Sequence, residues 1–126
     1  MSRGKPEGSR GPRIPQLLLV EGRSMEPGLH DGSWVVMLPR PGWLPRVGEV
    51  VVARHPERAG YEMIKRVAAV SRPRRLVWLA GDNREESTDS DQFGPLPAAL
   101  MVGRVILAVR PWPPRLLFRR PTRLWL

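Results

Sequence analysis

Cysteine is absent from this chain of 126 residues, and only two histidines are present. The absence of cysteine excludes a disulfide framework, an iron–sulfur cluster and a thiol nucleophile. A histidine-rich metal site is not expected either, and nothing in the sequence indicates a metal or another cofactor. Any nucleophile of this chain is therefore a serine, a threonine or a lysine.

Long apolar runs are lacking as well. The best are residues 14–20 and the proline-broken residues 95–103, whereas a membrane-spanning helix needs about 18 apolar residues. The basic N-terminus is followed by no apolar stretch of the length that a signal peptide requires. From these absences we expect no membrane-spanning segment and a cytoplasmic protein.

The net charge of +9 is concentrated at the two ends of the chain. Residues 1–13 carry +3 and residues 110–126 carry +5, so only +1 is left for the middle. A duplex-binding domain carries its positive charge on a folded face, so we expect no nucleic-acid partner. The length fits one domain over residues 14–110, between a flexible basic arm and a tail over residues 111–126. That tail, basic and aromatic, either packs on the body or makes a peripheral membrane contact.

Six short runs rich in β-branched residues, separated by Gly- and Pro-rich turns, predict strands. Their even spacing favours an all-β, mainly antiparallel fold with at most one short helix. That helix is expected near residues 97–101, where Pro97 would occupy the first helical position. The predicted strands are 16–21, 33–38, 48–54, 61–70, 75–80 and 102–109.

Ser24 and Lys65 are the two candidates for chemistry. Ser24 follows a predicted strand in a Gly- and Pro-rich turn, where a serine either acts as a nucleophile or hydrogen-bonds its own backbone. Strand alternation places Lys65 on one face with Tyr61, Met63, Val67 and Ala69. Burial there would have to lower the lysine pKa from about 10.4 by roughly three units for the amine to act as a base near neutral pH. The alternative is a lysine at a strand edge with its amine in water.

A dense polar segment, residues 81–94, separates two apolar strands. Its side chains either form a loop by hydrogen-bonding the backbone or reach a site elsewhere. Ser87 and Asp89 are the residues of this segment that would orient a lysine amine.

Four short motifs in order resemble the conserved boxes of type I signal peptidases, a family of serine–lysine peptidases. They are Gly22-Arg-Ser-Met-Glu-Pro, Gly48-Glu-Val-Val-Val, Ile64-Lys-Arg-Val and Gly81-Asp-Asn-Arg-Glu-Glu-Ser-Thr-Asp-Ser, within residues 20–110. The resemblance implies a small catalytic β-domain in which Ser24 is the nucleophile and Lys65 the general base. It also implies that Ser87 orients the lysine, that Asp89 is structural, and that the Ser24 backbone N–H forms the oxyanion hole.

The resemblance has three departures. Gly22 stands where some relatives have a serine that assists the oxyanion hole, and Asp91 stands where relatives often have an arginine that pairs with the residue matched by Asp89. Arg84 is a candidate replacement for that arginine. We also expect no membrane anchor before the first motif, in contrast to the signal peptidases that this chain resembles.

The small size of the chain, and the residues that follow the second and fourth motifs, are similar to those of the nickel-type superoxide dismutase maturation proteases. That similarity implies removal of an N-terminal propeptide from a nickel superoxide dismutase precursor. An extended substrate would add as a strand along residues 16–21. Met25 and Tyr61 either line its pocket or pack in the core.

Three other functions remain open. A Ser–His–Asp hydrolase would combine Ser24 with His30 or His55 and with Asp31, Asp82 or Asp89, although the sequence has no nucleophile elbow. An autoproteolytic repressor-type domain would need a DNA-binding module that the 13-residue arm is too short to supply. A non-catalytic β-module would bind anionic partners through its arginine-rich ends.

Overall fold

The computed structural model describes residues 14–22, 25–26, 28–82, 94–110 and 115–117. The regular structure within these residues is almost entirely β-strand, with one short 3-10 helix, so the predicted all-β class is confirmed. The elements are β1 (Gln16–Leu19), β2 (Trp34–Pro39), β3 (Val50–Arg54), β4 (Glu62–Ser71), β5 (Leu76–Ala80), β6 (Leu96–Pro97), η1 (Ala98–Leu100), β7 (Met101–Arg110) and β8 (Arg115–Leu116).

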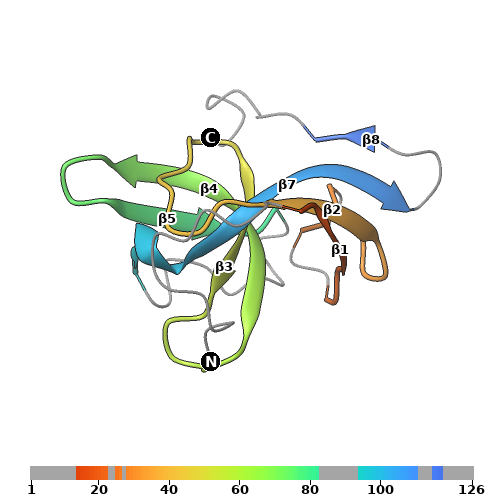
Figure 1. Cartoon of the computed structure of the whole chain (residues 1–126), viewed down its shortest axis with the longest axis horizontal. Helices are drawn as coiled ribbons and strands as arrows, with labels where there is room; N and C mark the ends of the chain where they lie inside the picture. The colour runs from red at the N-terminus through yellow and green to blue at the C-terminus, as the bar shows by residue number, and fades with distance from the viewer. Residues whose placement is uncertain (1–13, 23–24, 27, 83–93, 111–114, 118–126) are drawn as a thin grey trace.

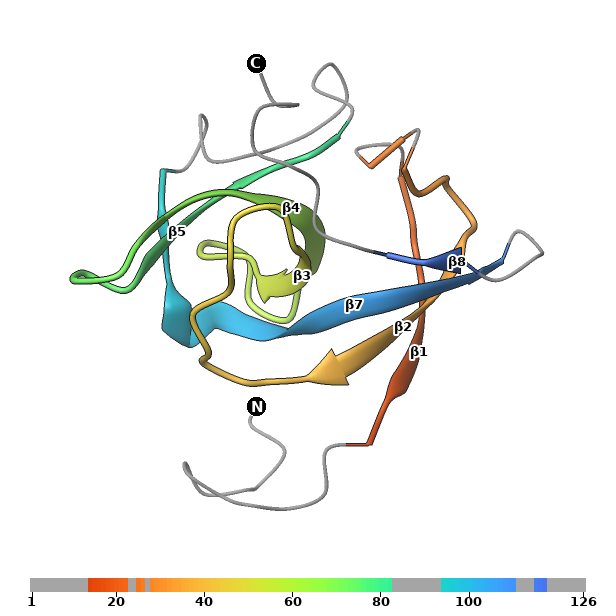
Figure 2. The same cartoon turned by 90° about the horizontal axis from the view of Figure 1, so that it is seen from above.

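The strands form one antiparallel sheet in the order β1-β2-β7-β3-β4-β5-β6, and β8 pairs with β7. The long strand β7 connects the two halves, because it pairs with β2 on one edge and with β3 on the other. Figures 1 and 2 show β1 and β2 on one side of β7, and the β4–β5 hairpin extending away on the other side. The sheet curls, so β1 and the start of β4 come to line one cavity.

Each of the six predicted strands is present, with ends that differ by up to a few residues. The structure adds the two-residue strands β6 and β8. Strand β8 lies in the predicted tail over residues 111–126, and its Leu116 pairs with Leu107 of β7. The predicted short helix is η1, but Pro97 is its N-cap, with extended ψ of 144°, rather than its first helical residue.

Two clusters of buried side chains fill the fold. One lies between the β1–β2 hairpin and the neighbouring parts of β3 and β7, and it includes Met25, Leu29, Val35 and Val105. The other lies between β3, β4 and β5, and it includes Val51, Val67 and Leu79. Burial of these apolar surfaces is the main force that holds the two halves of the sheet against each other.

Strand β4 alternates as the sequence predicts from Met63 to Val67, which are buried with Lys65 between them. The pairing with β5 shifts register between Val67 and Ala69, a β-bulge that changes which face the later residues occupy. Ala69 is consequently exposed, and its predicted place on the buried face is wrong.

Candidate functional site

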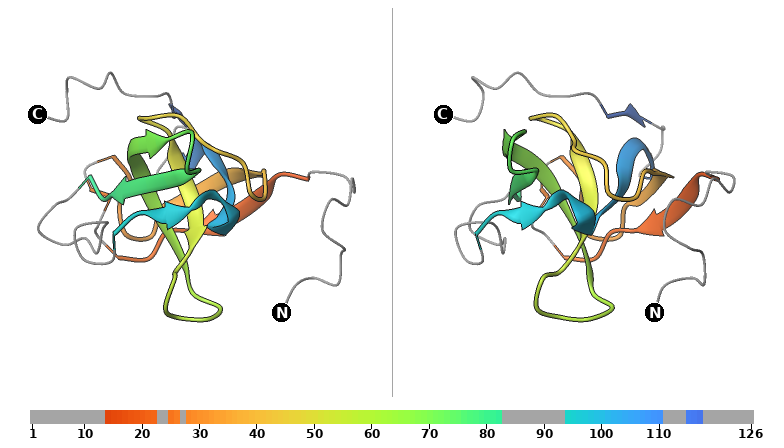
Figure 3. Two further views of the ribbon diagram at one scale, coloured as in Figure 1. Left: turned by 90° about the vertical axis from the view of Figure 1, so that its left-hand side faces the viewer. Right: turned by 60° about the vertical axis from the view of Figure 1, so that its left-hand side comes forward.

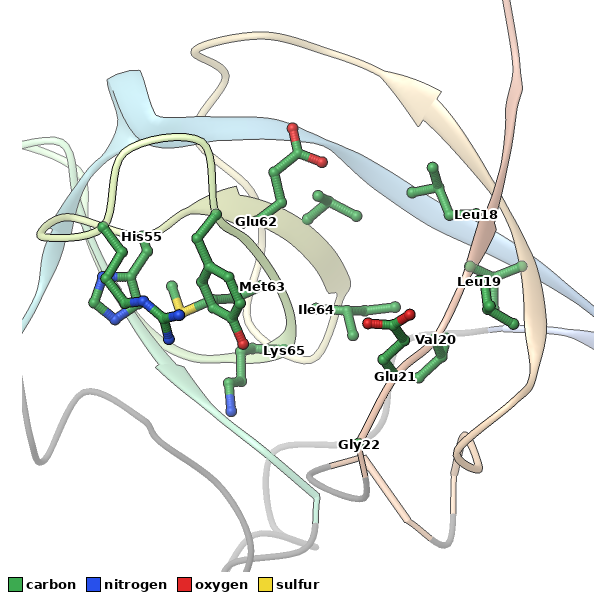
Figure 4. Close-up of a pocket in the computed structure, with 14 residues that line it drawn as sticks. Leu18, Leu19, Val20, Glu21, Gly22, His55, Glu62, Met63, Ile64 and Lys65 are labelled. Carbon is green, nitrogen blue, oxygen red and sulfur yellow. The ribbon is translucent and has the colours of Figure 1, made fainter.

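A cavity of about 350 Å³ lies between the end of β1 and the beginning of β4. Leu18, Val20 and Gly22 line it from the β1 side, and Met63, Ile64 and Lys65 line it from β4. Figure 4 shows Gly22 and Lys65 on opposite sides of the opening. Gly22, which stands two positions before Ser24, and the predicted base Lys65 therefore line the same cavity.

Lys65 lies in the interior of the sheet. Strand β4 is paired on both sides, with β3 and β5, and Lys65 stands opposite Val51 of β3. Only 4% of the Lys65 surface is exposed, and its neighbours on the same face are Met63 and Val67. The alternative of an edge lysine in water is wrong for this chain. Such burial disfavours the charged ammonium form relative to the neutral amine.

Ser24 lies outside the described residues, but the chain on both sides of it is tied down. Val20 donates its N–H to Ser33 O at 2.8 Å, and Gly32 donates to Val20 O at 2.8 Å. These bonds extend the β1–β2 hairpin to the point where the segment containing Ser24 leaves and returns. Within that segment, Leu29 N donates to Met25 O at 2.8 Å, and both side chains are buried in the core.

Gly22, the position where some relatives carry a serine, has φ of +92°. Its N–H donates to Asp31 Oδ1 at 2.9 Å. A Cβ at Gly22 would meet no atom within 4 Å, so the positive φ rather than crowding favours glycine here. The exposed loop residue Asp31 therefore holds the backbone at the mouth of the cavity.

The other predicted site residues are placed as follows. Tyr61 lines the cavity and is 45% exposed. Met25 is 1% exposed and belongs to the core cluster, the alternative that the sequence left open for it. Ser87 and Asp89, with the candidate partner Arg84, lie outside the described residues.

The sequence analysis missed a buried ion pair beside Lys65. Arg66 Nε and Nη2 donate to the two carboxylate oxygens of Asp82, each at 2.9 Å, and Arg66 Nη1 donates to Gly48 O at 3.0 Å. The side chains of Arg66 and Asp82 are 5% and 2% exposed. A signal was present, because both residues stand inside the motifs that carry the resemblance, Lys65-Arg66 and Gly81-Asp82. The pair ties the strand that carries Lys65 to the start of the polar segment.

Gly28 packs against the same carboxylate. A Cβ at Gly28 would lie 2.7 Å from Asp82 Oδ2 and 3.3 Å from Met25 O. Only a glycine lets the turn that follows Ser24 approach Asp82 this closely. One ion pair therefore contacts three parts of the proposed site: β4, the beginning of the polar segment, and the turn after Ser24.

The histidines and the other carboxylates have contacts that favour structural roles. Nδ1 of His30 lies 3.7 Å from Glu26 Oε2 at the surface, and Nδ1 of His55 accepts the N–H of Glu57 at 3.0 Å. Asp82 faces Arg66, and Asp31 holds Gly22. These contacts favour structural roles over a Ser–His–Asp arrangement, although His55 lines the cavity together with Lys65.

Comparisons with known proteins agree with the motifs. A family model described as "Signal peptidase, peptidase S26" matches residues 14–71 and 73–112. Subunit 1 of the mitochondrial inner membrane protease from Xenopus tropicalis is 32% identical over 120 residues, which cover 79% of this chain and 71% of the relative. The corresponding subunit from Schizosaccharomyces pombe is 33% identical over 118 residues, covering 78% and 75%. Subunit 2 from Saccharomyces cerevisiae is 29% identical over 127 residues, covering 80% and 70%.

These relatives overturn the cytoplasmic location expected from the sequence. Their names assign them to a protease of the mitochondrial inner membrane. No helix within the described part of the chain is long and apolar enough to cross a membrane. The expectation failed because it inferred a location from missing apolar runs alone.

Proposed function

The chain belongs to the signal peptidase family, peptidase S26, and from that premise we propose that Ser24 and Lys65 form the catalytic dyad of a serine endopeptidase. The observation that carries the proposal is the buried position of Lys65 in a cavity that also contains Gly22, two residues before Ser24. A lysine in the core of a sheet is costly to keep charged, and a neutral amine is what the proposed chemistry requires.

The mechanism is acyl transfer. The neutral amine of Lys65 takes the proton from Ser24 Oγ as that oxygen attacks the scissile carbonyl carbon. The backbone N–H of Ser24 donates to the oxyanion of the tetrahedral intermediate. Collapse breaks the peptide C–N bond, the lysine proton goes to the leaving amine, and an acyl-enzyme remains. A water molecule, deprotonated by Lys65, then hydrolyses the ester and regenerates both residues.

Ser87 and Asp89 support the dyad in this proposal. Ser87 hydrogen-bonds the lysine amine and orients its lone pair toward Ser24, and Asp89 has a structural role in the same segment. The Arg66–Asp82 pair favours this arrangement, since it fixes residue 82, from which the segment with Ser87 departs.

The substrate binds as an extended strand along the free edge of β1. Among the described strands, β1 is terminal in the sheet and pairs only with β2, so within this part of the chain its outer edge is left for a further strand. Leu18 of β1 and Lys65 of β4 both line the cavity. Tyr61 forms part of its far wall.

The finer substrate proposal is an N-terminal propeptide, removed from a nickel superoxide dismutase precursor. Its support is the motif resemblance; the relatives reported above carry other names, as subunits of inner membrane proteases. The alternative is a precursor protein delivered at a membrane, as the names of those relatives suggest.

The location proposed in place of the cytoplasm is a membrane surface. The names of the relatives support it, and so does a row of apolar side chains exposed on the outer face of the β1–β2 hairpin and β8: Leu17, Leu19, Trp34 and Leu116. The basic, aromatic tail over residues 111–126 adds the peripheral contact with lipid headgroups.

The experiment that tests the dyad uses a peptide library randomised at every position, with products identified by mass spectrometry. Wild-type protein is expected to cut peptides at one preferred bond. The variants Ser24→Ala and Lys65→Ala are expected to cut none, while the controls Ser71→Ala and Lys5→Ala, the latter at the only other lysine, keep full activity. Cleavage by Lys65→Ala at the wild-type rate overturns the dyad, and a library left intact by wild type overturns the peptidase.

The same five proteins are then given the nickel superoxide dismutase precursor. Loss of a single N-terminal fragment with wild type alone supports that substrate. An uncut precursor, with peptides cut, rejects this substrate and keeps the peptidase. Removal of residues 118–126, which leaves β8 in the sheet, separates the peptidase from a β-module that binds anionic partners, because only the module depends on that basic segment for its function.

A further inference from the structure

The connection between β3 and β4 forms a rigid tip at the end of the cavity farthest from Gly22. His55 N donates to Tyr61 O at 2.8 Å and Tyr61 N donates to Arg58 O at 3.1 Å, so backbone bonds close this connection. Gly60 supplies the positive φ, +80°, that the turn needs. Figure 3 shows the connection projecting from the rest of the sheet.

Three side chains of this tip stack on one another. The Arg58 guanidinium lies over the Tyr61 ring at 4.2 Å from its centroid, and the His55 ring meets the Tyr61 ring edge-on at 5.6 Å. All three residues line the cavity. The tip therefore presents a positioned cation to whatever occupies the cavity.

Arg58 is suited to bind a carboxylate. In the part of the chain that the structure describes, no carboxylate forms an ion pair with Arg58. A guanidinium has five N–H donors in a planar fork, and a contact with an aromatic face fixes the group without supplying an acceptor for them. An acidic side chain in the cavity would supply that acceptor.

The other charges of the cavity leave this end cationic. Lys65 also lines the cavity, four residues after Tyr61 along the chain, and Glu21 lies on the β1 wall, where Figure 4 shows its carboxylate beside Ile64. Glu62 also lines the cavity, but it stands opposite Arg54 in the β3–β4 register, and its carboxylate points away from Lys65. An acidic group is thus disfavoured near Glu21 and favoured at Arg58.

Strand spacing gives the position that Arg58 would contact. Tyr61, just before β4, and Met63 and Lys65 of β4 all line the cavity, at every second position of the chain. Four residues of extended chain span about 13 Å, for this stretch and for a substrate strand along β1 across the cavity alike. A substrate whose scissile bond lies at Lys65 therefore has a side chain about four residues away beside Tyr61 and Arg58.

We propose that Arg58, held on Tyr61, forms a subsite that selects an acidic side chain about four residues from the scissile bond. The proposal rests on the peptidase function above, since the scissile bond sets its register. Arg58 acts on substrate choice and takes no part in the chemical step, so its effect falls mainly on KM.

The test compares wild type, Arg58→Glu and Arg58→Lys in the randomised peptide library. Arg74→Glu is the matched control, because Arg74 is exposed in the β4–β5 turn and does not line the cavity. Wild type and Arg74→Glu are expected to enrich Asp and Glu at that position. Arg58→Lys retains the preference, and Arg58→Glu reverses it toward Lys and Arg.

Single peptides chosen from the library then give the magnitude. Replacing the selected acid by lysine is expected to lower kcat/KM about tenfold for wild type, mainly through KM. The same replacement is expected to raise kcat/KM for Arg58→Glu. A structural role of Arg58 would change both peptides equally, so an unchanged ratio overturns the proposal.

A second arm does not depend on cleavage. The library is passed over immobilised Lys65→Ala and over Lys65→Ala with Arg58→Glu, and retained peptides are identified. Acid-enriched peptides that are retained only by the Lys65→Ala protein support the subsite. They do so even if wild type cuts no peptide, a result that would reject the peptidase function but not the subsite. Equal retention of acidic and basic peptides by both proteins overturns the subsite.

Discussion

Arg66 and Asp82 form a buried ion pair with two parallel hydrogen bonds, each of 2.9 Å, next to the proposed catalytic lysine. Neighbouring residues of β4 point to opposite faces, so Lys65 enters the cavity while Arg66 turns to Asp82 and to Gly48 O. The arrangement separates a lysine that must lose its proton from an arginine that never does.

Removing one member of this pair is expected to destabilise the fold strongly. Asp82→Ala or Arg66→Met should each lower the free energy of unfolding by about 3–5 kcal/mol, because the remaining charge is left buried without its partner. The double variant should cost clearly less than the sum, since it removes both charges from the interior. Urea unfolding of the four proteins measures the coupling.

The second ion pair of the sheet provides the control for that cycle. Arg104 Nε lies 3.4 Å from Glu49 Oε2, and the Arg104 side chain is one-third exposed; Glu49, although only 7% exposed, also accepts the N–H of Arg46 at 2.9 Å and keeps that bond when Arg104 is replaced. Arg104→Met is therefore expected to cost about 1 kcal/mol or less. Equal losses for Arg104→Met and Arg66→Met would contradict the importance of burial at Asp82.

Gly28→Ala tests how closely the turn after Ser24 must approach Asp82. The added Cβ would lie 2.7 Å from Asp82 Oδ2, so the carboxylate or the turn has to move. We expect a loss of about 1–3 kcal/mol in unfolding free energy and a fall in kcat for peptide cleavage. In an Asp82→Ala background the same substitution should cost much less, and an equal cost in both backgrounds would show that the contact is not the cause.

Strand alternation located Lys65 and its neighbours Met63 and Val67 from the sequence, because a two-residue period needs only local information. The bulge that exposes Ala69 and the pairing of Leu116 with Leu107 depend on the partner strand, which no local pattern specifies. The Arg66–Asp82 pair joins residues 16 positions apart. In the sequence alone, Arg66 and Asp82 cannot be distinguished from charged residues exposed to solvent, because only the fold places them in contact.

Substitutions at Lys65 can separate chemistry from stability. Lys65→Met keeps the length of the side chain and removes a buried amine, so the free energy of unfolding should change by no more than about 1 kcal/mol, while peptide cleavage is lost. Lys65→Arg keeps a cation but supplies a group that cannot act as a base at neutral pH. Cleavage by Lys65→Arg within tenfold of wild type would exclude proton transfer to this side chain.

Gly103 occupies the junction between the two halves of the sheet. It stands opposite Pro39 of β2 on one edge of β7 and opposite Val52 of β3 on the other. A Cβ there would lie 2.5 Å from Leu38 O and 2.8 Å from Met37 Cγ. The close contact of β2 with β7 at this point therefore requires a residue without a side chain.

Gly103→Ala is expected to separate β2 from β7 locally and to lower the free energy of unfolding by about 2–3 kcal/mol, measured by urea denaturation. Because β2 continues from the segment that contains Ser24 and β3 leads into the strand of Lys65, the shift should also lower kcat. Adding Met37→Ala removes the side-chain contact but leaves the one with Leu38 O, so recovery should be partial at most. An unchanged urea midpoint for Gly103→Ala would mean that the two halves of the sheet tolerate a wider spacing. The contact at Gly103 would then not set the distance between Ser24 and Lys65, and the Arg66–Asp82 pair would be left to do so.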